Sequence, residues 1–102
     1  MYLKIEEDNM AYTITSYTKE QARKHNVVVK PSSVKGKKID VFNKKGEKLA
    51  SVGALGYSDY PTFIKEKGLT YANERRRLYK ERHDKDRHER GSAGWYADKL
   101  LW

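Results

Sequence analysis

The stretch of the chain that most restricts the fold is a predicted β-hairpin at residues 37–52. Two segments of strand-forming residues, 37–42 and 48–52, flank the turn sequence Asn-Lys-Lys-Gly-Glu. Asn at the first turn position, and Gly46 where a positive φ is needed, fit a type I turn followed by a glycine bulge. We therefore expect an antiparallel strand pair here, and not an all-helical fold.

Ahead of the hairpin, the pattern predicts short strands around one short helix. Residues 1–7 and 11–17 are strand candidates, and the β-branched run 27–30 ends at Pro31, which cannot donate a hydrogen bond to a neighbouring strand. The sequence Thr-Lys-Glu-Gln has the spacing of a capping box and predicts a helix over 18–25. The Asn that follows this helix suits the left-handed conformation in which helices often end.

Behind the hairpin, the pattern predicts helices. Asp59 is placed to cap a short helix that ends at Gly68. Residues 70–90 contain neither Gly nor Pro and predict one long charged helix. The Gly-containing stretch 91–94 ends that helix, and residues 95–102 predict an apolar tail of one or two helical turns.

This order of elements predicts an α+β fold, with a small antiparallel sheet followed by helices. A length of 102 residues is that of one domain. No internal repeat and no Gly/Ser-rich or Pro-rich linker divides the chain. We expect residues 1–102 to form a single domain, with residues 1–10 as a loosely attached arm.

The composition indicates a basic protein with anionic partners. The 22 Lys and Arg residues against 14 Asp and Glu residues give a net charge of +8, which favours nucleic acid, acidic protein surfaces or anionic lipid. The apolar runs all fall short of the ~18 residues that a membrane span needs. Residues 6–8 are acidic where a secretory signal would continue apolar, so we expect a protein that is not secreted.

Catalytic and metal-binding motifs are missing from the sequence. The chain has no cysteine, which excludes disulfides, Cys-based zinc sites and thiol catalysis. It also has no nucleophile elbow, P-loop or dinucleotide-binding glycine motif. His83 and His88 are five residues apart, whereas two ligands on one helical face need a spacing of four, and cations surround their neighbours Asp84, Asp86 and Glu89. We predict a non-enzymatic protein without a cofactor or metal ion.

Positive charge is concentrated in two segments of the chain. The first lies between residues 74 and 90, which hold eight basic and five acidic side chains. The second surrounds the hairpin. The candidate binding residues of the two segments are Arg75, Arg76, Arg77, Lys80 and Arg82 in the first, and Lys37, Lys38, Lys44 and Lys45 in the second.

Each basic segment has two interpretations. A basic ridge on the helix suits a phosphate backbone. The interleaved acids instead fit a solvated or protein-contacting face held by ion pairs one helical turn apart. Lysines around a hairpin also protect an exposed sheet edge from aggregation. For the helix, the sequence favours a solvated or protein-contacting face. For the hairpin lysines, it leaves both interpretations open.

The tail is the most apolar part of the chain. Its five large apolar side chains are Trp95, Tyr96, Leu100, Leu101 and Trp102. In a chain that is otherwise poor in large apolar groups, this tail either closes the core or docks on a partner. We expect it to close the core.

The order of several sequence blocks resembles a known family. The blocks are Thr18-Lys19-Glu20-Gln21-Ala22, Lys30-Pro31-Ser32, Lys37-Lys38-Ile39-Asp40-Val41-Phe42, Ala50-Ser51-Val52-Gly53-Ala54, Asp59-Tyr60-Pro61-Thr62, Tyr71-Ala72, Arg75-Arg76-Arg77-Leu78-Tyr79-Lys80-Glu81-Arg82-His83 and Gly91-Ser92-Ala93-Gly94-Trp95-Tyr96-Ala97-Asp98-Lys99-Leu100-Leu101-Trp102. Over about residues 12–102 the chain resembles a family of small basic proteins encoded by large DNA viruses of algae and protists (phycodnavirus-like). The resemblance implies a virus-encoded protein of the virion and brings no catalytic residues.

These observations lead to two hypotheses of function. The preferred one is a minor capsid or other minor structural protein that contacts other virion proteins. The alternative is a nucleic-acid-binding protein for DNA packaging or regulation, which uses the basic helix 75–90 and the lysine cluster 35–48. Either hypothesis places the protein in the virion or in the cytoplasm or nucleus of the infected cell, and neither gives its oligomeric state.

Overall fold

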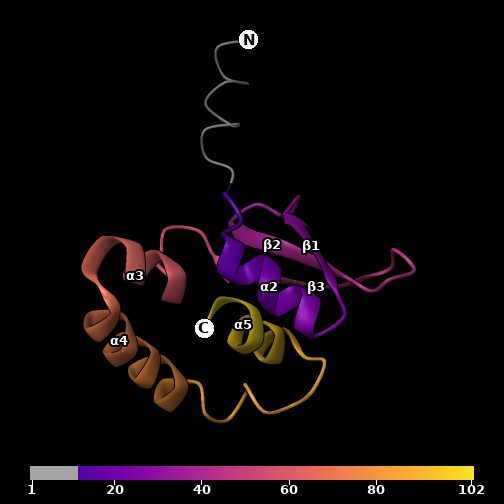
Figure 1. The fold of residues 1–102 in the computed structure, drawn as a ribbon. Coiled ribbons are helices and arrows are strands. Elements are labelled where there is room, and N and C mark those ends of the chain that lie inside the picture. The colour runs from indigo at the N-terminus through magenta and orange to yellow at the C-terminus, as the bar shows by residue number, and fades with distance from the viewer. Residues whose placement is uncertain (1–11) are drawn as a thin grey trace.

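The computed structural model describes residues 12–102 as a three-stranded antiparallel sheet and four helices (Figure 1). The strands, in the order β1-β2-β3, are β1 (Val28–Pro31), β2 (Lys37–Phe42) and β3 (Lys48–Ala54). The helices are α2 (Ser16–Lys24), α3 (Tyr60–Lys67), α4 (Leu69–Arg82) and α5 (Ala93–Leu101). The predicted α+β class, with strands first and most helices after them, is confirmed.

The predicted hairpin is confirmed as β2 and β3. Ile39 lies opposite Val52 in the ladder, and both side chains are buried. At the turn, the N–H of Gly46 donates to the carbonyl oxygen of Asn43 (3.0 Å). The N–H of Asn43 donates to the carbonyl oxygen of Glu47 (2.9 Å). Gly46 has a φ of 90°, which a side chain would strain, so the turn needs glycine at this position.

The strand predicted for residues 11–17 is wrong over the part that the structure describes. Residues 12–15 have no regular structure, and α2 begins at Ser16. A strand needs a hydrogen-bonded neighbour, whereas a capped helix satisfies its own N–H groups, so a residue of high strand propensity still enters a helix when a cap precedes it. The strand predicted for residues 1–7 and the arm predicted for residues 1–10 lie outside the described residues.

The cap of α2 stands three residues earlier than predicted. The Thr15 side chain accepts a hydrogen bond from the N–H of Thr18 (3.2 Å). Thr18 itself is buried, and its hydroxyl donates to the carbonyl oxygen of Leu100 (2.8 Å), so it ties α2 to α5. The predicted end of the helix is confirmed, because α2 stops at Lys24 and Asn26 adopts a left-handed φ of 60°.

Two further predicted elements are confirmed within one residue. The strand predicted at 27–30 is β1. Asp59 caps α3 by accepting a hydrogen bond from the N–H of Thr62 (3.2 Å), and Gly68 ends the helix with a φ of 93°. These boundaries depend on local side-chain chemistry, which explains why the sequence predicts them.

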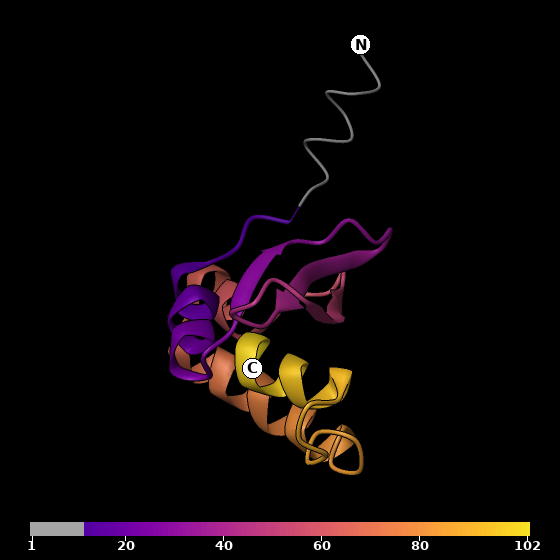
Figure 2. The same cartoon turned by 90° about the vertical axis from the view of Figure 1, so that its right-hand side faces the viewer.

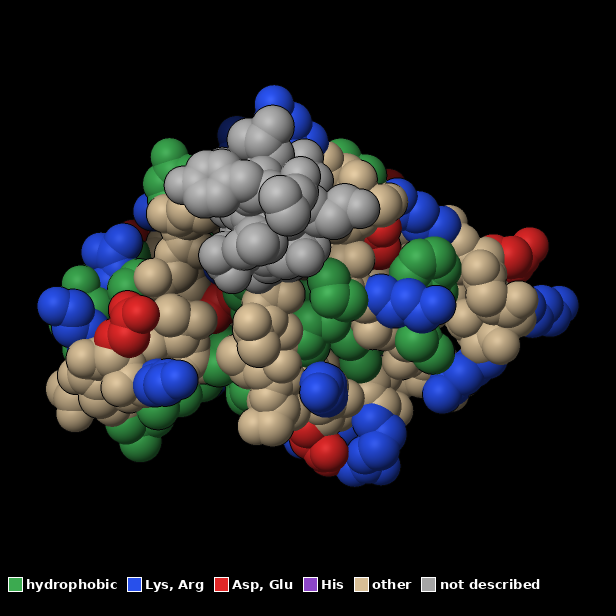
Figure 3. All heavy atoms as spheres, turned by 90° about the horizontal axis from the view of Figure 1, so that it is seen from above, with side chains coloured by type: hydrophobic (Ala, Val, Ile, Leu, Met, Phe, Trp, Pro, Cys, Tyr) green, Lys and Arg blue, Asp and Glu red, His purple; other side chains and the backbone are tan. Residues whose placement is uncertain are grey.

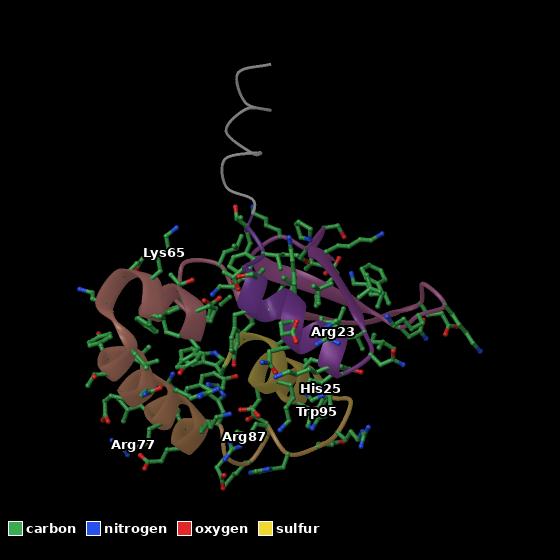
Figure 4. The ribbon with its side chains drawn as sticks, in the orientation of Figure 1. Arg23, His25, Lys65, Arg77, Arg87 and Trp95 are labelled. Carbon is green, nitrogen blue, oxygen red and sulfur yellow. The ribbon has the colours of Figure 1, made fainter. Side chains whose placement is uncertain are left out.

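The single helix predicted over residues 70–90 is too long. α4 ends at Arg82, and the chain then continues in turns. Arg87 folds back, donates from Nε to the carbonyl oxygen of Lys80 (3.0 Å) and brings Nη1 to 3.9 Å from the Asp98 carboxylate, between the ends of α4 and α5 (Figure 4). These contacts form only if the helix stops, so they outweigh the helix propensity of the following residues.

The helices form two groups around the sheet. α2 and α5 pack together and against the strands, and α3 and α4 form a corner beside them (Figure 1). α5 lies between the sheet and α4 (Figure 2). The core is made of Ala22, Val27, Ile39, Val41, Val52, Tyr96, Leu100 and Leu101. The apolar tail therefore packs into the core of its own chain as α5.

Candidate functional site

The basic residues predicted to form one ridge on α4 divide into three groups. Arg76 and Lys80 contact other elements of the chain. Arg77 lies on the outer face of α4. Arg75 and Arg82 line a cleft on another side of the helix. The five cations therefore do not form a single surface.

Arg76 and Lys80 hold the structure together. The Arg76 Nε donates to the main-chain oxygen of Trp102 (2.6 Å), and its Nη2 donates to the hydroxyl of Tyr17 (3.1 Å). The Lys80 ammonium lies 2.6 Å from the buried Asp98 carboxylate. Both charges are used inside the chain, where they connect α4 to α2 and α5.

Arg77 fits the solvated interpretation of the helix. Its side chain points away from α5 (Figure 4) and pairs along α4 with Glu74 (2.6 Å) and Glu81 (3.4 Å). All three side chains are more than half exposed, and such exposed pairs add little to stability. This face of α4 carries compensated charge and not a positive ridge.

The lysines around the hairpin also lie in different surroundings. Lys38 is buried, and its ammonium lies 2.9 Å from the Asp59 carboxylate, so it is not a surface cation as the sequence led us to expect. Lys44 and Lys45 are exposed at the hairpin turn, which extends away from α3 and α4 (Figure 1). Lys37 is exposed and lines the same cleft as the two arginines. Seen from above, Lys and Arg side chains stand at many separate places and not in one block (Figure 3).

The partner of Lys38 is the centre of a buried polar group. Asp59 accepts hydrogen bonds from the hydroxyl of Tyr12 (2.6 Å), from Lys38 and from the N–H of Thr62. Burial raises the pKa of Asp59, but these donors outweigh it and hold the pKa below its usual value. Burial and the neighbouring carboxylate raise the pKa of Tyr12. The sequence identified Asp59 only as a helix cap, because nothing local indicates a partner 21 residues away.

A cleft of about 400 Å³ lies between β3, α4 and α5. Its lining includes Lys37, Tyr57, Phe63, Arg75, Arg82 and Trp102, and the first turn of α5 forms part of the wall. This volume is near the lower end of the range for small-ligand sites. A cavity of this size admits one small group.

Positive charge exceeds negative charge in the cleft. Arg75, Arg82 and Lys37 have no acidic side chain within ion-pair distance among residues 12–102. Among residues 12–102, the buried Nε of Arg75 has no hydrogen-bond partner, an arrangement that is costly unless a ligand or solvent supplies an acceptor. One acid, Asp86, also lines the cleft and lies 3.6 Å from His83.

Aromatic rings form much of the cleft wall. Tyr79 is stacked on Trp102, with ring centroids 4.3 Å apart and an interplanar angle of 9°, and Phe63 lies 6.1 Å from Trp102. Burial and the nearby carboxylates raise the pKa of Tyr79 to about 12, so its phenol stays neutral at physiological pH. Tyr57 differs from these rings because it is 75% exposed. The predictions from the sequence did not single out Tyr57, although Gly56 before it and the helix cap Asp59 after it are signals of a turn.

The sequence also predicted that the protein has neither a metal site nor a membrane-spanning helix. No group of three or more His, Asp or Glu side chains in the part of the chain that the structure describes is arranged to hold a metal ion. His88 lies 3.0 Å from Asp84, which makes an exposed pair only. None of the helices between residues 12 and 102 is long and apolar enough to cross a membrane.

Comparisons with known proteins add no similarity to these observations. No protein-family model, curated protein or solved structure matches the chain. The resemblance to viral proteins therefore stays a prediction. A fold alone does not specify a function. We therefore base the proposed function on the chemistry of the cleft.

Proposed function

We propose that the protein is a non-enzymatic nucleic-acid-binding protein that holds a phosphate backbone in the cleft between β3, α4 and α5. The observation that supports this most is that both basic segments of the sequence contribute to the same cleft. Lys37 comes from the hairpin, and Arg75 and Arg82 come from α4. Guanidinium and ammonium groups that lack acidic partners are available to phosphate oxygens, which accept their hydrogen bonds.

The charge of the whole chain supports the same function. A net charge of +8 attracts a polyanion over a long range and favours binding by release of its counterions. The cleft offers point charges and rings, and neither Asn nor Gln is among the lining residues in the described part of the chain. The amides of Asn and Gln read base edges. Because the described lining lacks them, we expect binding with little sequence preference.

A salt titration of binding tests the proposal. The probe is a fluorescently labelled oligothymidine of about 20 nucleotides. The cleft variant Arg75→Ala/Arg82→Ala is compared with the matched control Arg23→Ala/Arg77→Ala, which removes two exposed arginines that pair with glutamates (Figure 4). Each lost phosphate contact reduces the slope of log K against log salt by about 0.7 for a single strand, so the cleft variant is expected to lose about 1.4.

The control variant is expected to keep the wild-type slope, apart from the effect of its lower net charge, which both variants share. An equal slope for the two variants would contradict binding in the cleft. Wild-type protein that shows no binding at low salt would contradict nucleic-acid binding altogether. Arg76 is unsuitable for this test because it holds Trp102 and Tyr17, so its loss would alter the fold.

The virion structural role is the second candidate. Leu69 and Tyr71, at the start of α4, are 57% and 44% exposed, and the exposed Glu74–Arg77 pair follows along the same helix. Exposed apolar side chains beside mixed charges suit a protein partner better than a phosphate backbone. The test is mass spectrometry of purified virus particles. Incorporation that is lost in Leu69→Glu but kept in Arg75→Ala/Arg82→Ala would favour this role over nucleic-acid binding.

A further inference from the structure

Tyr57 is the most exposed large apolar side chain in the described part of the molecule, at 75%. It lines the cleft, yet among residues 12–102 its ring contacts no other aromatic ring and its hydroxyl makes no hydrogen bond. The other tyrosines nearby behave differently, since Tyr60 and Tyr79 are buried and packed. The fold therefore makes little use of the Tyr57 ring.

The backbone nevertheless holds Tyr57 in place beside the cleft cations. The N–H of Tyr57 donates to the carbonyl oxygen of Ala54 (3.3 Å), which closes the turn after β3. The N–H of Leu55 donates to the carbonyl oxygen of Gly36 (2.9 Å) and ties this turn to the residue before Lys37. Two residues after Tyr57, the chain is anchored by the buried Asp59. The turn is held at both ends, so the backbone of Tyr57 has a fixed place beside the cleft.

We infer that Tyr57 is a stacking platform for a base of single-stranded nucleic acid, whose phosphates lie on Arg75, Arg82 and Lys37. This inference rests on the proposed function and specifies its partner. In a duplex the faces of the bases are covered by their neighbours, whereas a single strand leaves them open to an aromatic side chain. A cavity of about 400 Å³ suits one nucleotide-sized group and is small for a double helix.

The ring distinguishes a base from a carboxylate group. Carboxylates would pair with Arg75, Arg82 and Lys37 as phosphates do, but they have no aromatic face to stack on the ring of Tyr57. Base–aromatic stacking is tolerant of sequence because every base has a π-face. The inference therefore agrees with the weak sequence preference expected from the cleft lining.

The test compares wild-type protein with Tyr57→Ala and Tyr57→Phe. Fluorescence anisotropy measures binding of the labelled oligothymidine, of a duplex of the same length and of polyglutamate at low salt. We expect the wild type to bind the single strand more tightly than the duplex. Tyr57→Ala is expected to weaken single-strand binding about 5- to 100-fold, and Tyr57→Phe, which keeps the ring, is expected to stay within about threefold of the wild type. Because Tyr57 is exposed, both variants are expected to keep the wild-type thermal unfolding midpoint.

Other outcomes separate failure of the inference from failure of the proposed function. If Tyr57→Ala binds the single strand as the wild type does, or if the duplex binds as tightly as the single strand, the inference is wrong. The proposed function then still stands, provided that loss of Arg75 and Arg82 lowers the salt slope. If Tyr57→Ala weakens polyglutamate binding to the same extent, the ring does not recognise a base and the inference is also wrong. If neither nucleic acid binds, both are wrong.

Discussion

Four charged side chains are buried in the described part of the protein. Lys38, Asp40, Asp59 and Asp98 are each no more than 4% exposed. Burying a charge is costly unless a partner and hydrogen bonds compensate it. Each of the four has such partners: Lys38 and Asp59 pair with each other, Asp98 pairs with Lys80, and Asp40 accepts hydrogen bonds from the hydroxyls of Ser32 and Ser51.

Loss of one member of the Lys38–Asp59 pair is expected to destabilise the fold. Lys38→Met keeps the length of the side chain but leaves the Asp59 carboxylate buried without its cation, which typically costs about 3–5 kcal/mol of unfolding free energy. Lys37→Met is the matched control, since the neighbouring lysine is exposed, and it is expected to change stability by about 0.5 kcal/mol or less. Urea unfolding at pH 7 measures both. Equal stability of the two variants would show that the buried pair contributes nothing.

Among the elements, α5 has the largest role in the core. Leu100 and Leu101 are at most 1% exposed, and α5 packs on both α2 and β3. The carbonyl oxygen of Leu100 accepts a hydrogen bond from the hydroxyl of Thr18, and this bond joins α5 to α2. Gly53 lets β3 approach this helix, because an added Cβ there would stand 2.8 Å from the Leu101 side chain. The tail is thus an internal element and not a free docking peptide.

Two leucines test how far stability depends on α5. Leu101→Ala removes a buried side chain next to the sheet and leaves a cavity, so it is expected to cost about 2–5 kcal/mol. Leu69→Ala makes the same chemical change at a position that is 57% exposed, and it is expected to cost less than about 1 kcal/mol. Urea unfolding of both variants gives the difference. A similar cost at the two positions would mean that α5 does not form the core.

For the molecule as a whole, the buried carboxylates determine how stability depends on pH. Burial raises the pKa of Asp40, but hydrogen bonds from Ser32, Ser51 and the N–H of Ser33 outweigh it and hold the pKa well below its usual value. The pKa of Asp59 is lowered in the same way. The unfolded chain, with Asp pKa values near ~3.9, then binds more protons than the folded protein at acidic pH.

The folded protein is accordingly expected to lose stability as the pH falls below about 4, and to keep the contribution of these carboxylates at all higher pH values. Asp40→Asn cannot titrate, so its free energy of unfolding is expected to fall less steeply between about pH 4 and pH 2. Glu66→Gln, on the exposed side of α3, is the control and is expected to keep the wild-type slope. Urea unfolding across this pH range measures the slopes. A wild-type slope in Asp40→Asn would contradict the role assigned to Asp40.

The elements that the sequence predicted well are those with a local cause. The hairpin turn depends on Asn43 and Gly46, and α3 depends on its cap at Asp59, all within a few residues of the structure that they specify. Two of the errors fell where a contact beyond the neighbouring residues intervenes. Thr18 has the features of a cap but bonds to Leu100, and the predicted long helix stops because Arg87 reaches back to Lys80.

The candidate site shows the same division between local chemistry and tertiary contact. The sequence alone specified the α+β class, the hairpin and the two basic segments, because strand alternation, turn residues and charge are all properties of neighbouring residues. It left undecided which cations stay free. The fold placed Lys38 in the interior with Asp59, used Arg76 and Lys80 to hold α5, and brought Lys37 to the cleft of Arg75 and Arg82. Those roles depend on contacts between residues far apart in the chain, and such contacts exist only once the sheet and helices have packed.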